Sequence, residues 1–340
     1  MSSSLKKFLV TRILLTIPMI LIMITLVFFI MRVLPGDPIR SQLGPRVSEE
    51  QADRLRERLG LNEPILVQYG NYLKDMFTFD FGNALTRGER PIRDELGERL
   101  PATLELAIPA LIFASVFGIG LGAVAAKNRK KTADYGIRIF SIFIYSIPIF
   151  FLGLIFQIVF GVRLDILPLS GRMDPILLTT FESKTNFYIL DSILTQNWAA
   201  LKSALQHLIM PSITLGLSLM GVFIRLTRVN MIEMIKSDFI TAGRARGISE
   251  KRLVYKHALH NTFIPILTLI GLQTAMLIAG AVLTETTFSW PGMGRYLVDR
   301  IALRDYTAVQ STIAVFAFFV ALISLVMDIL YALIDPRIRY

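Results

Sequence analysis

The chain has 340 residues, of which 53% are apolar and only 18% are charged, and it contains no cysteine. Soluble globular proteins average about 45–50% apolar and about 25% charged residues, so this composition excludes an ordinary soluble protein and indicates a membrane protein. The formal net charge is +10, but the basic residues lie between long apolar runs. Nucleic acid is therefore not an expected partner. The absence of cysteine excludes disulfides, thiolate metal sites and a cysteine nucleophile.

Long apolar runs give the first structural prediction. Each is free of Asp, Glu, Lys and Arg and has about the 20 residues that a helix needs to cross a bilayer core of about 30 Å. The runs cover residues 13–31, 106–126, 139–162, 203–224, 261–284 and 306–327. We therefore expect an all-α, polytopic fold with six transmembrane helices. The first run is longer than a signal-peptide core and lacks a small-residue cleavage site, so we expect it to be retained.

The basic residues predict the orientation of the chain. With the N-terminus inside, the cytoplasmic segments hold 18 Lys and Arg against five acidic residues, whereas the external segments hold 18 basic and 20 acidic residues. Lys and Arg accumulate on the cytoplasmic side of membrane proteins. Both termini are therefore expected in the cytoplasm, in a multi-pass protein of the cell membrane.

The polar segments between the runs predict how the chain is divided. The stretch that follows the first run carries two amphipathic helical patterns, at 48–59 and 64–77, and a later external segment carries a mixed pattern at 187–201 that is compatible with a surface helix. The expected parts are a tail with the first helix (1–34), an external subdomain (35–101), a five-helix membrane core (102–335) with a cytoplasmic loop at 237–261, and a second tail (336–340).

No motif for catalysis or cofactor binding is present. The sequence lacks a G-x-x-x-x-G-K-[ST] phosphate loop, a G-x-S-x-G elbow, an H-E-x-x-H zinc helix and an EF-hand loop. His257 and His260 could share a helix face, but no third metal ligand lies nearby, which favours a structural or interfacial role. We expect no cofactor and no enzymatic activity, and ATP-driven work would have to take place on another polypeptide.

One acidic residue lies inside an expected span. Asp328 is near the cytoplasmic end of the last run, and a short acidic side chain needs a partner there. Arg225 and Arg228, at the inner end of the fourth run, are the candidate partners. Asp328 and Arg225 are thus candidates either for a pathway charge or for a structural pair, and the position near the membrane boundary favours the structural pair.

Small residues and prolines predict features of the spans. Gly118 and Gly122 in the second run are four residues apart, a spacing that permits close helix packing in lipid. The same spacing occurs at Gly271, Ala275 and Ala279, and Pro18, Pro148 and Pro211 are possible kink points.

The segment after the fourth run predicts a short cytoplasmic helix. Ser237 can cap a helix of about nine residues, and Gly247 is suited to the left-handed residue that ends it. Its middle residues are small and would let it enter a groove on a partner, with arginines at the rim. The alternative is an ordinary basic loop that binds lipid headgroups. The candidate coupling residues are Asp238, Thr241, Ala242, Gly243, Arg244, Ala245, Arg246 and Gly247.

This segment resembles a known family. Thr241-Ala242-Gly243, followed after three residues by Gly247, is similar to the E-A-A-x-x-x-G coupling loop in membrane subunits of binding-protein-dependent ATP-binding-cassette (ABC) importers, with Thr in place of Glu and Gly in place of the second Ala. The wider string D-F-I-T-A-G-R-A-R-G and the H-A-L-H-N at 257–261 resemble the B-type subunits of the dipeptide and oligopeptide permease branch. Further segments that resemble this branch are 34–38, 101–106, 169–172 and 283–295.

The resemblance implies a type I ABC importer permease fold and a set of partners. These are a second homologous permease subunit in a heterodimer, two cytoplasmic ATPase subunits and an external solute-binding protein. Peptides are the implied cargo, with nickel chelates, haem, glutathione and glycosides as other cargoes of the branch. The alternatives are a secondary transporter or channel, which would respond to ion gradients rather than ATP, and a membrane scaffold or intramembrane enzyme.

Overall fold

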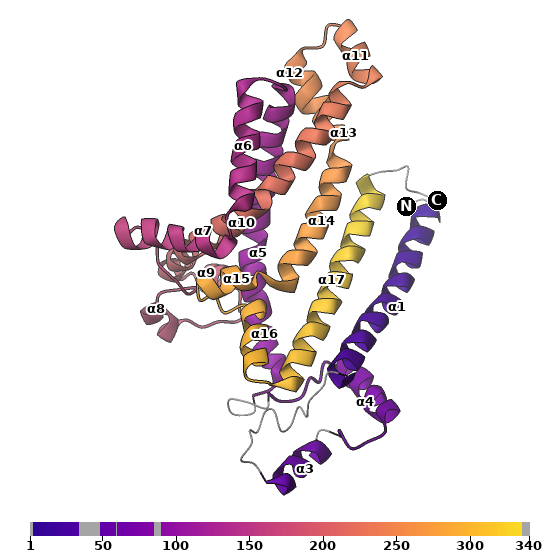
Figure 1. The fold of residues 1–340 in the computed structure, drawn as a ribbon, viewed down its shortest axis with the longest axis vertical. Coiled ribbons are helices and arrows are strands. Elements are labelled where there is room, and N and C mark those ends of the chain that lie inside the picture. Colours follow the sequence, from indigo (N-terminus) through magenta and orange to yellow (C-terminus); the bar gives the residue numbers. More distant parts are fainter. Residues whose placement is uncertain (1–2, 34–47, 59, 85–89, 335–340) are drawn as a thin grey trace.

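The computed structural model describes residues 3–33, 48–58, 60–84 and 90–334. The described elements are helices, and the described residues contain one isolated β-bridge, between Asn83 and Pro91, and no strand. The molecule is elongated, with α11 (Asp238–Ala245) at one end and α3 (Glu49–Arg58) at the other (Figure 1). We call these the α11 end and the α3 end.

The remaining elements follow one another along the chain. In order, they are α1 (Ser3–Val33), α4 (Ile65–Thr78), α5 (Ile92–Lys127), α6 (Thr132–Ser146), α7 (Ile149–Phe156), the π-helix η1 (Gln157–Arg163), α8 (Pro175–Thr180), α9 (Tyr188–Leu194), α10 (Trp198–Ile235), α12 (Glu250–Arg252), the π-helix η2 (Leu253–Ala258), α13 (Leu259–Asn261), α14 (Phe263–Gly280), α15 (Val282–Thr287), α16 (Met293–Ala302) and α17 (Tyr306–Ile334).

Four of the expected apolar runs lie inside long continuous helices. In the described chain, α1, α5, α10 and α17 are long and apolar enough to cross a membrane. They contain the runs 13–31, 106–126, 203–224 and 306–327. With 36 and 38 residues at about 1.5 Å per residue, α5 and α10 are longer than a bilayer core is thick, so both extend beyond it.

The other two runs do not form single long helices, and the six-span count is therefore not confirmed. The run 139–162 is divided between α6 and the α7–η1 helix, which meet at an angle of 97°. Pro148 lies at the break, and Ile147 before it is extended (φ −78°, ψ 125°), as the ring of a following proline favours. The run 261–284 is divided between α14 and α15.

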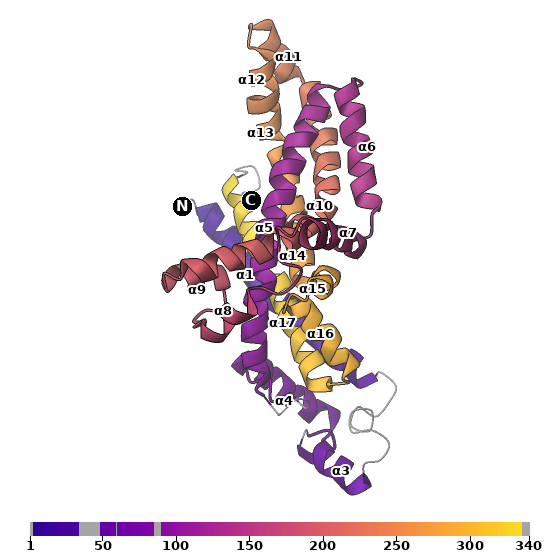
Figure 2. The same ribbon diagram turned by 90° about the vertical axis from the view of Figure 1, so that its left-hand side faces the viewer.

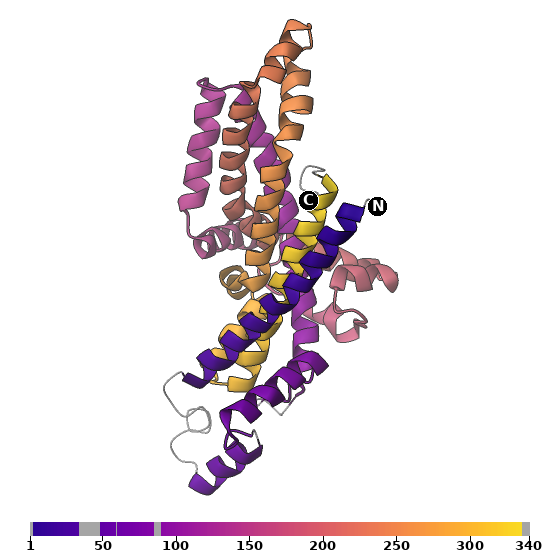
Figure 3. The same ribbon diagram turned by 90° about the vertical axis from the view of Figure 1, so that its right-hand side faces the viewer.

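Close helix packing at small residues is confirmed for α5 and α10. A Cβ on Gly118 would overlap the Cβ of Phe223, and a Cβ on Gly122 would lie 2.7 Å from the Cβ of Thr227. The two helices can approach this closely because glycine carries no side chain. On α14, Gly271 likewise packs against Met327 of α17. Figure 3 shows α1 lying along α17, on the side of the molecule that faces away from α6 and α7 in Figure 1.

The three prolines of the apolar runs occupy different positions relative to the helices. Pro18 and Pro211 lie within the continuous helices α1 and α10, whereas Pro148 precedes the first residue of α7. Proline is well tolerated at the start of a helix because its missing N–H has no intrahelical acceptor there.

The external patterns are partly confirmed. The predicted helices at 48–59 and 64–77 correspond to α3 and α4. The pattern at 187–201 is not one surface helix, because α9 ends at Leu194 and α10 begins at Trp198. The expected domain boundary at residue 101 lies within α5, which begins at Ile92.

Candidate functional site: the coupling segment and the buried polar network

The short helix predicted after the fourth run is present as α11, but its start is not capped as expected. Ser237 is extended (φ −68°, ψ 155°), and its hydroxyl donates to the Met234 carbonyl at 2.6 Å instead of accepting from the helix. Asp238 occupies the first turn, where its charge is favourable to the helix dipole.

The end of α11 is fixed by a Schellman motif around Gly247. Gly247 has a φ of +79°, as predicted for the left-handed residue. Its N–H donates to the Arg244 carbonyl at 3.0 Å, and the N–H of Ile248 donates to the Gly243 carbonyl at 3.2 Å. A β-branched residue at 247 would be strained in this conformation.

The buried face of α11 is directed toward its own chain. Ile240 is 1% exposed, and a Cβ on Gly243 would lie 2.7 Å from Leu253 Cδ2 in η2. The expectation that Gly243 enters a partner's groove is therefore wrong, because this residue permits close packing of α11 on η2. The contact between α11 and η2 thus explains why the residue at position 243 is small.

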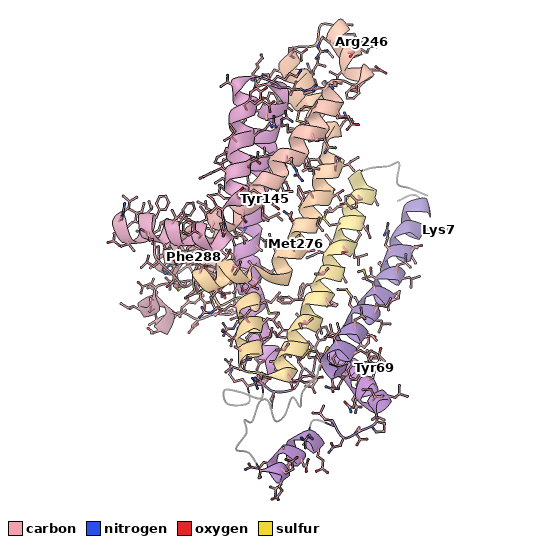
Figure 4. All side chains as sticks on the ribbon, in the orientation of Figure 1. Lys7, Tyr69, Tyr145, Arg246, Met276 and Phe288 are labelled. Atoms are coloured by element: carbon pink, nitrogen blue, oxygen red, sulfur yellow. The ribbon has the colours of Figure 1, made fainter. Side chains whose placement is uncertain are left out.

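The opposite face of α11 is open to solvent and partly apolar. Phe239 is 46% exposed, and Ala242 and Ala245 are exposed with it. Phe239 and Ala242 are three residues apart, so they lie on the same side of the helix. Thr241 and Arg246 are also exposed, and Arg246 lies at the tip of the molecule (Figure 4). This surface suits insertion into an apolar groove with a polar rim.

The coupling segment is anchored in the ends of the long helices. An apolar cluster joins α11 and η2 to α5 and α10, and the ammonium of Lys127 lies 5.3 Å from the centre of the Tyr255 ring. Figure 2 shows α11 beyond the ends of α5 and α10. The buried members of this cluster are Ala123, Ala126, Met231, Ile240, Leu253, Val254 and Ala258.

Arg244 is engaged within the segment itself. Its guanidinium pairs with the Glu250 carboxylate, and this hydrogen bond lowers the pKa of Glu250 below its ordinary value. The pair ties α11 to α12 at the surface. His257 and His260 lie in η2 and α13, where no group of three potential metal ligands occurs among the described residues.

Asp328 does not pair with α10. Its carboxylate lies 3.1 Å from Arg12 of α1, while Arg228 makes a bidentate contact with the buried Asp134 at 2.6 and 2.8 Å. Arg225 is exposed on α10. The predicted partners were wrong because α1, and not α10, lies beside α17, and the linear sequence does not reveal which helices are neighbours.

A buried ion pair that the sequence analysis missed lies at the start of the second run. Arg172 donates to the Glu105 carboxylate at 2.5 Å, with side chains 4% and 6% exposed. The guanidinium also lies 3.7 Å from the centre of the Tyr188 ring and 5.6 Å from that of Trp290. The second carboxylate oxygen of Glu105 accepts from the Ile189 N–H at 2.8 Å. The segment from Arg172 to α9 is thereby fixed to α5.

The loop before α16 is fixed to the same part of α5. Trp290 Nε1 donates to the Ala102 carbonyl at 2.7 Å. The Thr103 hydroxyl donates to the Glu285 carboxylate at 2.8 Å and accepts from the Met293 N–H at 2.8 Å. These contacts are buried, so each polar group must have its partner for the arrangement to be stable.

The glycines of this loop make room for a carboxylate. A Cβ on Gly292 would overlap the Glu285 carboxylate, and the N–H of Arg295 donates to the same group at 2.8 Å. These hydrogen bonds favour the charged form of the Glu285 carboxyl group. We call this arrangement and the Arg172–Glu105 pair the buried polar network.

The network joins three segments that the sequence singled out separately. Residues 101–106, 169–172 and 283–295 all contribute to it. The available signal was that Glu105 and Glu285 each lie directly next to an apolar run, whereas Arg172 adjoins no run. Only the fold shows which of these groups lie together. A second buried cluster follows along α5, where Arg300 donates to both oxygens of Glu95 at 2.6 and 2.5 Å.

Comparisons with known proteins match both halves of the chain. Residues 118–340 match the family described as binding-protein-dependent transport system inner membrane component, and residues 5–107 match the N-terminal part of such membrane components.

Individual relatives align over nearly the full length. A dipeptide transport system permease protein of Alkalihalophilus pseudofirmus is 43% identical and covers 97% of this chain and 98% of its own. A di/tripeptide transport system permease protein of Pseudomonas aeruginosa is 42% identical, with coverage of 98% and 99%. A glutathione transport system permease protein of Escherichia coli is 35% identical, also with coverage of 98% and 99%.

The fold is similar to that of a solved ABC transporter. The inward-facing MetNI methionine ABC transporter matches with a TM-score of 0.53 and 14% identity, covering 71% of this chain and 96% of the solved one. This likeness concerns the fold. Together with the family match, it shows that the chain belongs to the binding-protein-dependent transport system inner membrane components, the multi-pass permease subunits of ABC importers.

Proposed function

We propose that this permease forms half of the translocation pathway of an importer for dipeptides or similarly small peptides. Relatives named for dipeptides and for di- and tripeptides, at 43% and 42% identity, support this cargo. The other half of the pathway is a second, homologous permease subunit. Two cytoplasmic ATPase subunits and an external solute-binding protein complete the complex.

The observation that carries the proposal is the rigid α11 with its open face. The chain has no phosphate loop, so ATP hydrolysis takes place on the partner ATPases and reaches the membrane through a docked surface. Phe239, Ala242 and Ala245 provide that surface, and the Schellman motif at Gly247 fixes its angle.

Movement of α11 is transmitted along α5 and α10. The apolar cluster beneath α11 holds both helices, and the glycine contacts at Gly118 and Gly122 hold them to each other. Further along α5, the Arg172–Glu105 pair and the Trp290 hydrogen bond attach the external segment and the loop before α16. Closure of the ATPases therefore shifts these parts as one unit and changes which side of the pathway is open.

The test changes α11 at its exposed face and at its C-terminal end. Ala242→Leu adds bulk to the exposed side of α11, and Gly247→Val strains its end by about 1–2 kcal/mol. We expect both variants to insert and assemble, because apolar spans and flanking charges are unchanged. In the reconstituted complex, they are expected to lose at least tenfold in ATP hydrolysis stimulated by dipeptide-loaded binding protein. Lys251→Ala, on the neighbouring α12, is the matched control.

Normal stimulation in both assembled variants would exclude α11 as the coupling element. Gly243→Leu is a useful third variant, since its side chain would collide with Leu253 and displace α11 from within. Transport that persists without ATP and follows an imposed proton gradient would instead support a secondary transporter.

A further inference from the structure

A polar cavity lies at the α3 end, away from the coupling segment. It has a volume of about 290 Å³, is partly open, and is lined by the end of α1, the turn before α4, one side of α4, the loop that follows α4 and the start of α17. Tyr69 of α4 marks this region beside the end of α1 (Figure 4). The volume is near the lower end of the range of about 300–1,000 Å³ that small-molecule pockets occupy, so it suits a small solute.

Arg32 gives the lining of the cavity a positive charge. The guanidinium of Arg32 lies 5.1 Å from the centre of the Phe28 ring and 5.0 Å from that of Tyr306, and it donates to the Tyr306 hydroxyl. Its Nε is buried and has no hydrogen-bond partner among the described residues. The aromatic rings hold the guanidinium in place, while part of its hydrogen-bonding capacity is unused.

Two carboxylates give the same lining negative charge. Asp75 of α4 and Asp80 of the following loop both line it. Burial, with the repulsion of the Asp80 charge, raises the pKa of Asp75. Within the described chain, no ion pair joins Arg32 to either carboxylate. The cavity is therefore lined by opposite charges that are not paired with each other.

Neutral polar groups complete the polar part of the lining. Gln68 donates through Nε2 to the carbonyls of Leu61 at 3.0 Å and Glu63 at 2.7 Å, whereas its Oε1 is buried and has no partner in the described part of the protein. Gln310 and Ser311 of α17 also line the cavity. A buried amide oxygen without a partner is unfavourable, and a bound molecule with a donor would relieve that cost.

An apolar pocket of about 330 Å³ lies on the far side of Met76 and Phe81, which line both spaces. Its other lining residues are almost all apolar, so it suits hydrocarbon, whereas the polar cavity also presents charged and amide groups. The division at these two side chains separates a lipid-like site from one for a charged solute.

We propose that the polar cavity is a binding site for a small zwitterion, an amino acid or a dipeptide, whose ammonium group faces Asp75 and Asp80 and whose carboxylate faces Arg32. Carboxylate–guanidinium and ammonium–carboxylate contacts are charge-assisted hydrogen bonds, and separated opposite charges select a molecule that carries both. The site is distinct from the α11 coupling surface, and the inference does not depend on the proposed transport function.

The first test measures binding to the full chain in lipid nanodiscs. Radiolabelled alanyl-alanine is the probe, and its competitors are N-acetyl-alanyl-alanine, alanyl-alanine amide and glycerophosphoethanolamine. We expect saturable binding for which each blocked dipeptide competes at least tenfold more weakly than unlabelled alanyl-alanine. Equal competition by a blocked dipeptide, stronger competition by the lipid headgroup, or no saturable binding would overturn the proposal.

The second test locates the bound probe. Asp75→Asn and Arg32→Gln are each expected to weaken binding at least tenfold, whereas Lys74→Gln, on the same helix but outside the cavity, is expected to leave it unchanged. Hydrogen exchange on the unmodified chain keeps the test valid if a variant fails to fold, since alanyl-alanine should protect residues 60–82 and 306–311. Protection confined to other segments, or unchanged binding in both charge variants, would show that the cavity is not the site.

Discussion

At the residue scale, the buried Glu285 carboxylate restricts position 292 to glycine. The Glu285 carboxylate occupies the space that any β-carbon at 292 would need, and this carboxylate also accepts from Thr103 and from the Arg295 N–H. A side chain at 292 must therefore displace a group held from two other elements.

We expect Gly292→Ala to destabilise the permease by about 1–3 kcal/mol, the usual cost of overpacking. The purified chain in detergent should melt at a lower temperature than the parent. Gly70→Ala is the control, because a β-carbon there meets nothing within 4 Å and alanine favours a helix. Equal melting temperatures for the Gly292 variant and the parent would show that Glu285 moves away without cost.

The residues that sequence reasoning placed well are those whose role is local. Gly247 was predicted as the left-handed end of a helix, and its φ of +79° confirms this, because the requirement arises within a few residues. The partner of Asp328 was predicted wrongly, since Arg12 is close to it only after the two ends of the chain have packed together. The coupling roles assigned to α11 remain predictions.

At the scale of elements, the contact between α5 and α10 depends on glycines that face the partner helix. A β-carbon on Gly118 or Gly122 would meet α10, whereas one on Gly120, in the same helix, would meet nothing within 4 Å. The three positions therefore provide a matched set within one helix.

We expect Gly118→Ala and Gly122→Ala each to lower the melting temperature and Gly120→Ala to leave it unchanged or raise it. In membranes, helices associate mainly through close packing, so stability is lost only where the new β-carbon meets α10. Thermal unfolding in lipid nanodiscs is the measurement. If all three variants melt alike, the close approach of α5 to α10 does not contribute to stability.

The apolar runs were predictable, but not all of them as single elements. The length of the runs and their lack of charged residues correctly predicted the four helices α1, α5, α10 and α17. Pro148 indicated a break in the third run, whereas the 97° angle could not be derived from it. The angle depends on where α7 packs, and Gly153 of α7 lies against Phe288 and Thr287, which are distant in sequence.

At the scale of the whole molecule, the arrangement predicts which surfaces face each side of the membrane. The loops at the α11 end carry an excess of basic residues, whereas the α3 end and the segment from η1 to α9 are nearly balanced in charge. Because Lys and Arg accumulate on the cytoplasmic side of membrane proteins, we expect the α11 end to face the cytoplasm.

Single cysteines provide a clean test, because the chain has none of its own. We expect cysteines at Arg54 and Lys184 to react with an impermeant thiol reagent in intact cells, and cysteines at Lys131 and Lys251 to react only after permeabilisation. All four positions are exposed. Reaction of the cysteine at position 251 in intact cells would show that the chain has the opposite orientation.

The ion pair between Arg12 and Asp328 has a consequence for biosynthesis. Arg12 lies in α1 and its partner lies in α17, so the arginine is synthesised well before the carboxylate. Until α17 has packed against α1 this contact is absent, and the long Arg12 side chain can reach toward the lipid headgroups. The contact between Arg12 and Asp328 therefore forms late, when α17 comes to lie beside α1.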